Sequence, residues 1–162
     1  MEGGHRVAGA RGARTAAGRH RGAAGRRGHA LVSLRIAGYA ALFDLPDGAR
    51  DTIRRGAFTR TLHERHDPYP LYWQHRSDRR IGWVETAGED ARGLRIVAQI
   101  DQPQGRAATL LRTRAVSGLS FGYRARRFRQ TPGGRELAEI DLFEVSVVTH
   151  PLQHAARIHF TA

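Results

Sequence analysis

Three residues that could carry out acyl transfer follow one another along the chain in the order His75, Ser120 and Glu144. A serine hydroxyl becomes a nucleophile when a histidine accepts its proton, and a carboxylate can orient that histidine. The residue types alone are weak evidence, because the chain has 9 histidines and 15 acidic residues. The sequence around each residue therefore decides how far it supports a site.

Ser120 lies between two glycines in Gly118-Leu119-Ser120-Phe121-Gly122. Glycine lets another chain approach the backbone closely, and the apolar neighbours would hold the serine in a strand. A serine between glycines can equally be structural. Ser120 is therefore a candidate nucleophile that needs a partner.

His75 follows the mostly apolar segment Leu71-Tyr72-Trp73-Gln74 and precedes the polar residues Arg76, Ser77, Asp78 and Arg79. This pattern indicates a strand that delivers a histidine to its end, beside a polar loop. Histidine titrates near neutral pH, so such a position suits a general base. The alternative is a surface histidine next to a loop.

Glu144 lies in the strand-like segment 140–148, where alternation places it on the face of Ile140, Leu142 and Val148. A carboxylate on an apolar face is costly unless it is paired. An imidazolium or an arginine could be that partner. Asp141, on the other face, and His150 remain alternatives for the third member of the site.

Two other chemistries fit less well. The glycines around Ser120 match the nucleophile elbow of esterases, with His150 or His154 as the base, but the elbow requires a turn into a helix and residues 121–128 alternate as an extended segment. His63 and His66 flank Glu64 at a spacing of three, which is not the zinc-protease pattern. The chain has no cysteine, which excludes disulfides and thiolate chemistry. We expect no cofactor and no metal.

The elements expected around these residues are mostly strands. Turn-forming residues separate them, so the predicted fold is β-rich α+β: a compact, closed or partly closed antiparallel or mixed β-barrel with two or three flanking helices. The expected strands are 31–43, 71–75, 81–85, 94–100, 116–128 and 136–149, and the expected helices are 53–66 and 104–114, with a short strand or helix before Phe160.

The basic charge is unevenly distributed. All 27 basic residues are arginine, and the net charge is +12. Residues 1–30 hold seven arginines, one acid and almost no large apolar side chain, which predicts a disordered basic tail. Residues 31–162 form the expected single folded domain. A basic tail attracts nucleic acid or acidic protein segments. No apolar run is long enough to cross a membrane, so we expect no membrane contact.

At these residues the sequence resembles the HK97-type phage prohead proteases, a serine peptidase family related in fold to herpesvirus assemblin. The resemblance covers about residues 34–158, and its landmarks occur in order: 38–43, 53–58, 71–75, Ile81-Gly82, Gly93-Leu94, 118–123 and 144–151. It implies that His75 and Ser120 are catalytic, with the acidic position of the family at Glu144. The chain departs from the family after Pro151, where Leu152-Gln153 replaces Ala-Asn.

The resemblance implies a serine endopeptidase that removes the scaffold segment of a major capsid protein, and then digests itself, during maturation of phage, prophage or gene-transfer-agent heads. The enzyme would be cytoplasmic, inside assembling proheads. We expect backbone N–H groups, with an arginine such as Arg124 or Arg126, to stabilise the oxyanion. Self-association and contact with nucleic acid through the tail are further expectations. The alternative function is a non-catalytic, basic head protein that binds scaffold.

Overall fold

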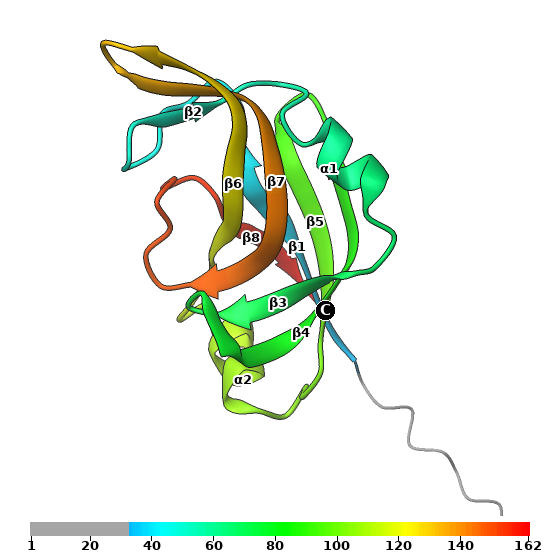
Figure 1. The fold of residues 1–162 in the computed structure, drawn as a ribbon. Helices are drawn as coiled ribbons and strands as arrows, with labels where there is room; N and C mark the ends of the chain where they lie inside the picture. The colour runs from blue at the N-terminus through cyan, green and yellow to red at the C-terminus, as the bar shows by residue number, and fades with distance from the viewer. Residues whose placement is uncertain (1–32) are drawn as a thin grey trace, which may run out of the picture. The chain divides into compact units, whose positions relative to one another are not determined.

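A computed structural model describes residues 33–162 (Figure 1). The tail predicted for residues 1–30 lies outside the described residues, so the tail and its boundary with the domain stay predictions. The described part of the chain contains the strands β1 (Leu34–Leu42), β2 (Asp51–Ile53), β3 (Tyr69–Trp73), β4 (Arg76–Glu89), β5 (Gly93–Ile100), β6 (Gly118–Thr131), β7 (Gly134–Val148) and β8 (Ile158–Thr161), and the helices α1 (Thr59–Glu64) and α2 (Arg106–Arg112).

The strands form one curved sheet in the order β2-β7-β3-β4-β5-β1-β8, with β6 paired to the other edge of β7. Most pairs are antiparallel, but β2 and β3 both run parallel to β7. The long β6–β7 hairpin turns at the Thr131–Gly134 pair, as its turn-forming residues predicted. This mixed topology confirms the predicted fold class.

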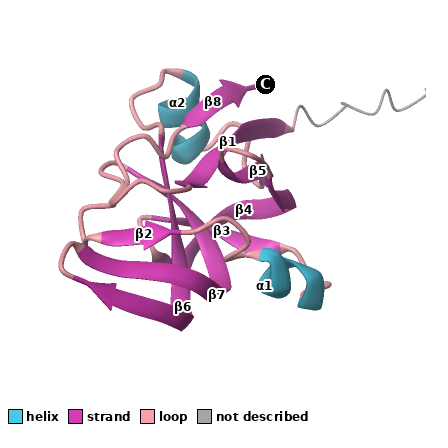
Figure 2. Cartoon of the chain, turned by 90° about the horizontal axis from the view of Figure 1, so that it is seen from above, coloured by secondary structure: helices cyan, strands magenta, loops and turns pink. Residues whose placement is uncertain are grey.

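The sheet closes partway on itself. The N–H of Leu119 in β6 donates to the carbonyl of Ala156, and the N–H of Ile158 donates to the carbonyl of Ser117. β8 in turn pairs with β1, so this connection joins the two ends of the sheet. The enclosed core is built from the alternating apolar side chains of β1, β5, β6 and β7. The helices α1 and α2 lie well apart, at different margins of the sheet, in both views (Figures 1 and 2).

The helix expected over 53–66 is wrong in its first half. Residues 51–53 form β2, and the helix α1 covers only Thr59–Glu64. Ile53 pairs with Leu137 in the parallel ladder between β2 and β7. Gly56 has a φ of +86°, a backbone conformation that a right-handed helix does not contain. The apolar residues of this segment therefore face the core from a strand and a turn rather than from one helix face.

The segment after Pro151, where the chain departs from the family, is anchored by a buried glutamine. The Oε1 of Gln153 accepts the N–H of Leu42, and its Nε2 donates to the carbonyls of Leu42 and Leu45, at 2.9 and 3.1 Å. One side chain thus satisfies three backbone groups at the end of β1. The connection from β7 to β8 is held against the barrel by this amide.

Replacing this glutamine tests that anchor. Gln153→Ala leaves the N–H and carbonyl of Leu42 without their partner, and each buried group left unsatisfied costs about 1–3 kcal/mol. We expect the free energy of unfolding to fall by about 2–4 kcal/mol, measured by urea denaturation. Gln153→Glu keeps the shape and the acceptor but loses the two donors, so it should also destabilise. Unchanged stability of both variants would contradict the anchor.

Candidate active site

Ser120 lies on β6, directly opposite Ser146 of β7. Gly122 lies opposite Glu144 two residues further along the same ladder. Residues that face each other across an antiparallel pair project to the same side of the sheet. Ser120, Ser146 and Glu144 therefore share one face, which is the face away from the core side chains Leu119 and Val147.

His75 belongs to a two-residue turn between β3 and β4, where Trp73 pairs with Arg76. Both turn residues are left-handed, with φ of +55° at Gln74 and +58° at His75, the pattern of a type I′ turn. Side chains with a Cβ adopt this region at a cost of about 1–2 kcal/mol each. Such strain persists only where surrounding contacts enforce it.

Contacts with β7 enforce the turn. β3 runs parallel to β7, and the N–H of Gln74 donates to the carbonyl of Val147 at 2.9 Å. The N–H of His75 donates to Oγ of Ser146 at 3.2 Å. The side-chain amide of Gln74 also exchanges two longer hydrogen bonds with Thr149. The hairpin tip is thus fixed to the same strand that carries Glu144.

The carboxylate of Glu144 contacts the imidazole directly. Its Oε1 lies 2.7 Å from Nδ1 of His75, and its Oε2 accepts a hydrogen bond of 2.6 Å from the hydroxyl of Ser146. The Glu144 side chain is 12% exposed, whereas that of His75 is 43% exposed. A nearly buried carboxylate therefore contacts a histidine that remains open to solvent.

The face assigned to Glu144 by simple alternation is partly wrong. Gly122 pairs with Glu144 but its neighbour Tyr123 pairs with Leu142, so Phe143 is an extra residue on β7. This bulge reverses the alternation, and it separates Glu144 from Leu142 and Ile140, which face the core. Glu144 lies on the outer face, where it meets His75 instead of apolar side chains.

Asp141 is engaged elsewhere. Arg60, Arg124 and Arg126 all pair with its carboxylate. These hydrogen bonds, first that of Arg60, lower the pKa of Asp141 to about 2. The same pairs hold Arg124 and Arg126, which the sequence offered as oxyanion donors.

His150, the other alternative for the third member, is exposed. Its Nδ1 lies 3.0 Å from the hydroxyl of its neighbour Thr149. Among the described residues, neither His150 nor Asp141 forms a hydrogen bond or ion pair with His75. Of the three alternatives, only Glu144 is hydrogen-bonded to the imidazole.

Ser120 itself is 8% exposed. Within residues 33–162, its hydroxyl forms no hydrogen bond with His75. Catalytic hydrogen bonds are often long without substrate and shorten when it binds. With Nδ1 held by Glu144, Nε2 is the nitrogen of His75 left to face an incoming group.

Sequence reasoning missed Ser146, although it is fully buried and bonded to both His75 and Glu144. The only sequence signal was that Ser146 lies two residues after Glu144 and so shares its face of the strand. That signal does not distinguish Ser146 from any other serine in a strand. His63, in the last turn of α1, and His66, two residues after that helix, are both exposed. Residues 33–162 contain no group of three or more metal-ligating side chains that could hold an ion.

Comparisons with known proteins show what this chain is similar to. The sequence model of the caudovirus prohead serine proteases matches residues 26–162. The prohead protease of Enterobacteria phage HK97 is 30% identical over 128 residues, which cover 75% of this chain and 57% of that protein. A capsid polyprotein of Pseudomonas phage PAJU2 is 32% identical over 102 residues, covering 56% of this chain but 15% of that protein.

Among solved structures, the protease of Kaposi's sarcoma-associated herpesvirus in complex with a hexapeptide phosphonate inhibitor superimposes with a TM-score of 0.54. The sequence identity is 13%, and the match covers 78% of this chain and 64% of that one, so it shows a shared fold. No helix among the described residues is long and apolar enough to cross a membrane. The match of the family model to residues 26–162 places this chain in the caudovirus prohead serine protease family.

Proposed function

We propose that the chain is a serine endopeptidase in which Ser120 is the nucleophile, His75 the general base and Glu144 the residue that orients the base. One observation carries the proposal. The carboxylate of Glu144 lies 2.7 Å from Nδ1 of His75, on the same face of the sheet as Ser120. The proposed nucleophile on β6 and the carboxylate on β7 thus share one face of the sheet, and the carboxylate contacts the proposed base in the β3–β4 turn.

The chemistry follows from the tautomer. Nδ1–H of His75 donates to Glu144, so Nε2 carries the lone pair that accepts the Ser120 proton. The Ser120 oxygen attacks the scissile carbonyl, and the imidazolium, stabilised by the Glu144 carboxylate, protonates the leaving amine. Water, activated by the same nitrogen, then hydrolyses the acyl-enzyme. We expect backbone N–H groups to stabilise the oxyanion.

Capsid protein is the proposed substrate. The family description refers to proheads, and the similar segment of the PAJU2 protein is part of a chain described as a capsid polyprotein. The chain spans little more than half the length of the HK97 relative, so this substrate is inferred. We propose cleavage of the scaffold segment of the major capsid protein inside the assembling prohead, together with self-cleavage.

Substitution of the three residues tests the mechanism. We expect Ser120→Ala and His75→Ala each to lower the cleavage rate about 10⁶-fold, and Glu144→Gln about 10⁴-fold, because an orienting residue contributes less than the reacting groups. The measurement is co-expression with the cognate major capsid protein and mass analysis of its N-terminus. A serine-reactive phosphonate should label the wild type and not the His75 variant. Complete processing by Ser120→Ala would reject the mechanism.

Gly122 offers a test of the Glu144 position. A Cβ at Gly122 would lie 2.7 Å from Oε1 of Glu144, so Gly122→Ala must displace the carboxylate oxygen that contacts His75. Because a displacement of about 1 Å can cost 10²-fold in rate, we expect kcat to fall about 10- to 100-fold. Gly88→Ala is the matched control, since no atom lies within 4 Å of the Cβ it adds. Equal activity of both variants would separate Glu144 from catalysis.

Ser146 should act by positioning. Its hydroxyl donates to Glu144 and accepts the N–H of His75, so Ser146→Ala frees both groups at once. We expect kcat to fall about tenfold with KM little changed, since a hydrogen bond to a charged group contributes about 1.5–3 kcal/mol. Single-turnover rates separate this from a binding defect. A variant that only raised KM would argue against positioning of the base.

A further inference from the structure

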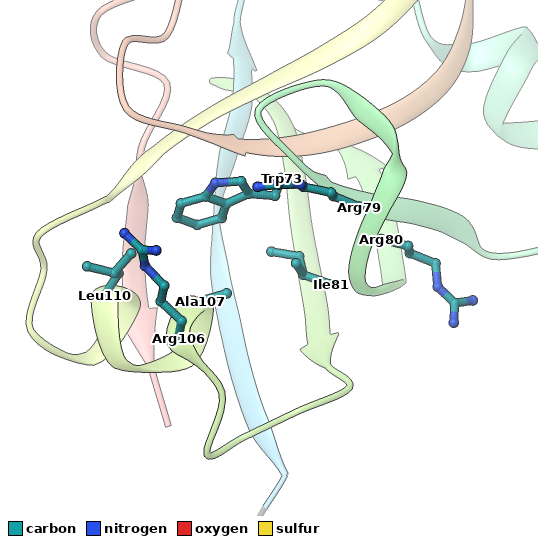
Figure 3. A pocket seen from close by; sticks show the side chains of 7 residues that line it. All are labelled: Trp73, Arg79, Arg80, Ile81, Arg106, Ala107 and Leu110. Carbon is teal, nitrogen blue, oxygen red and sulfur yellow. The ribbon is translucent and has the colours of Figure 1, made fainter.

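A pocket of about 380 Å³ lies between the β3–β4 hairpin and α2 (Figure 3). Its apolar lining consists of four partly buried side chains, Trp73, Ile81, Ala107 and Leu110. Trp73 pairs with Val147 of β7 and packs against the core. The pocket therefore lies on the core-facing side of β3. Ser120, Ser146 and Glu144 lie on the other face of the sheet.

Two arginines border this apolar surface. Arg79 and Arg106 line the pocket and extend toward the indole of Trp73 (Figure 3). Neither forms an ion pair or a side-chain hydrogen bond within residues 33–162. Arg80, the third arginine of the lining, pairs with Asp101 and stacks on Trp83.

The positive charges of Arg79 and Arg106 indicate which kind of ligand this pocket could bind. Many arginines of the described domain are paired with carboxylates of their own chain, and Asp141 alone takes three. Arg79 and Arg106 keep their guanidinium groups available at the edge of an apolar surface. Guanidinium binds carboxylate in a bidentate fashion, and the surface below it can bury an apolar side chain. The complementary ligand carries carboxylates next to apolar groups.

A second pocket adjoins the first. This depression, of about 360 Å³, shares Arg80, Ile81, Arg106 and Ala107 with the first and extends past Asp101 to Gly105. Because the two depressions share four lining residues, they lie side by side, and we call them together the groove. Two adjoining depressions suit an extended chain segment better than a compact ligand.

We propose that this groove is an exosite that binds an acidic segment with interspersed apolar residues, in the protein that the enzyme cleaves. This inference rests on the proposed function for the identity of the substrate. Three of the four apolar side chains in the first pocket are aliphatic, which favours peptide side chains over stacked bases. Because Trp73 lies two residues before His75, a bound segment would contact the same hairpin that presents the base.

Binding is measured in the Ser120→Ala variant, which cannot turn over a substrate. The chain has two tryptophans, so adding Trp83→Phe leaves Trp73 as the only one. The probe is a synthetic peptide of alternating glutamate and leucine, titrated while the emission of Trp73 is recorded. We expect saturable binding, weakened at least tenfold when glutamine replaces every glutamate, and weakened further by added salt.

Matched variants separate the groove from general basicity. Arg79→Gln and Arg106→Gln should each weaken binding about tenfold, whereas Arg127→Gln, which removes an exposed arginine of β6, should not. Circular dichroism confirms that the variants are folded. Equal binding of the glutamine peptide, equal loss in Arg127→Gln, or preferential binding of a thymidine oligonucleotide would overturn the exosite. Failure of the wild type to process capsid protein would instead reject the proposed function and leave this binding result standing.

Discussion

The candidate site depends on the hydrogen bonding of β7 along both of its edges. One edge pairs antiparallel with β6 and places Ser120 opposite Ser146. The other edge pairs in parallel with β3 and carries the hairpin tip to the same level. His75 and Glu144 are 69 residues apart in sequence, and the parallel ladder between β3 and β7 brings their side chains within 2.7 Å. A shift of either register by one residue would turn a member of the site to the other face.

The β3–β4 turn holds His75 in place at the cost of local backbone strain. Two side-chain-bearing residues in the left-handed region disfavour this turn, and asparagine and glycine would adopt it more readily. The bonds from Gln74 to Val147 and from His75 to Ser146 offset that cost. The hairpin tip is consequently held by its neighbours and not by its own turn preference. This arrangement keeps the solvent-exposed imidazole in one orientation.

Local patterns predicted what depends on local sequence. The strands around 94–100, 116–128 and 136–149 and the helix near 104–114 follow from periodicity and turn residues, and the structure contains them. The helix expected over 53–66 failed because a long-range parallel ladder claims Ile53. The bulge at Phe143 and the hydrogen bonds of the buried Ser146 could not be predicted from the sequence either. Both depend on which residue lies across the strand, and periodicity within one strand does not specify that.

With so many arginines in the chain, the residue opposite each carboxylate decides whether that carboxylate forms an ion pair with arginine. In a chain with 27 arginines, a carboxylate is readily captured, as Asp141 is by Arg124 on the adjoining strand. The residue opposite Glu144 is Gly122, which has no side chain to pair with it and leaves the space that the carboxylate fills. Glu144 therefore stays free for His75 and Ser146. Gly122, which the sequence suggested serves the backbone around Ser120, therefore leaves room for the carboxylate that contacts His75.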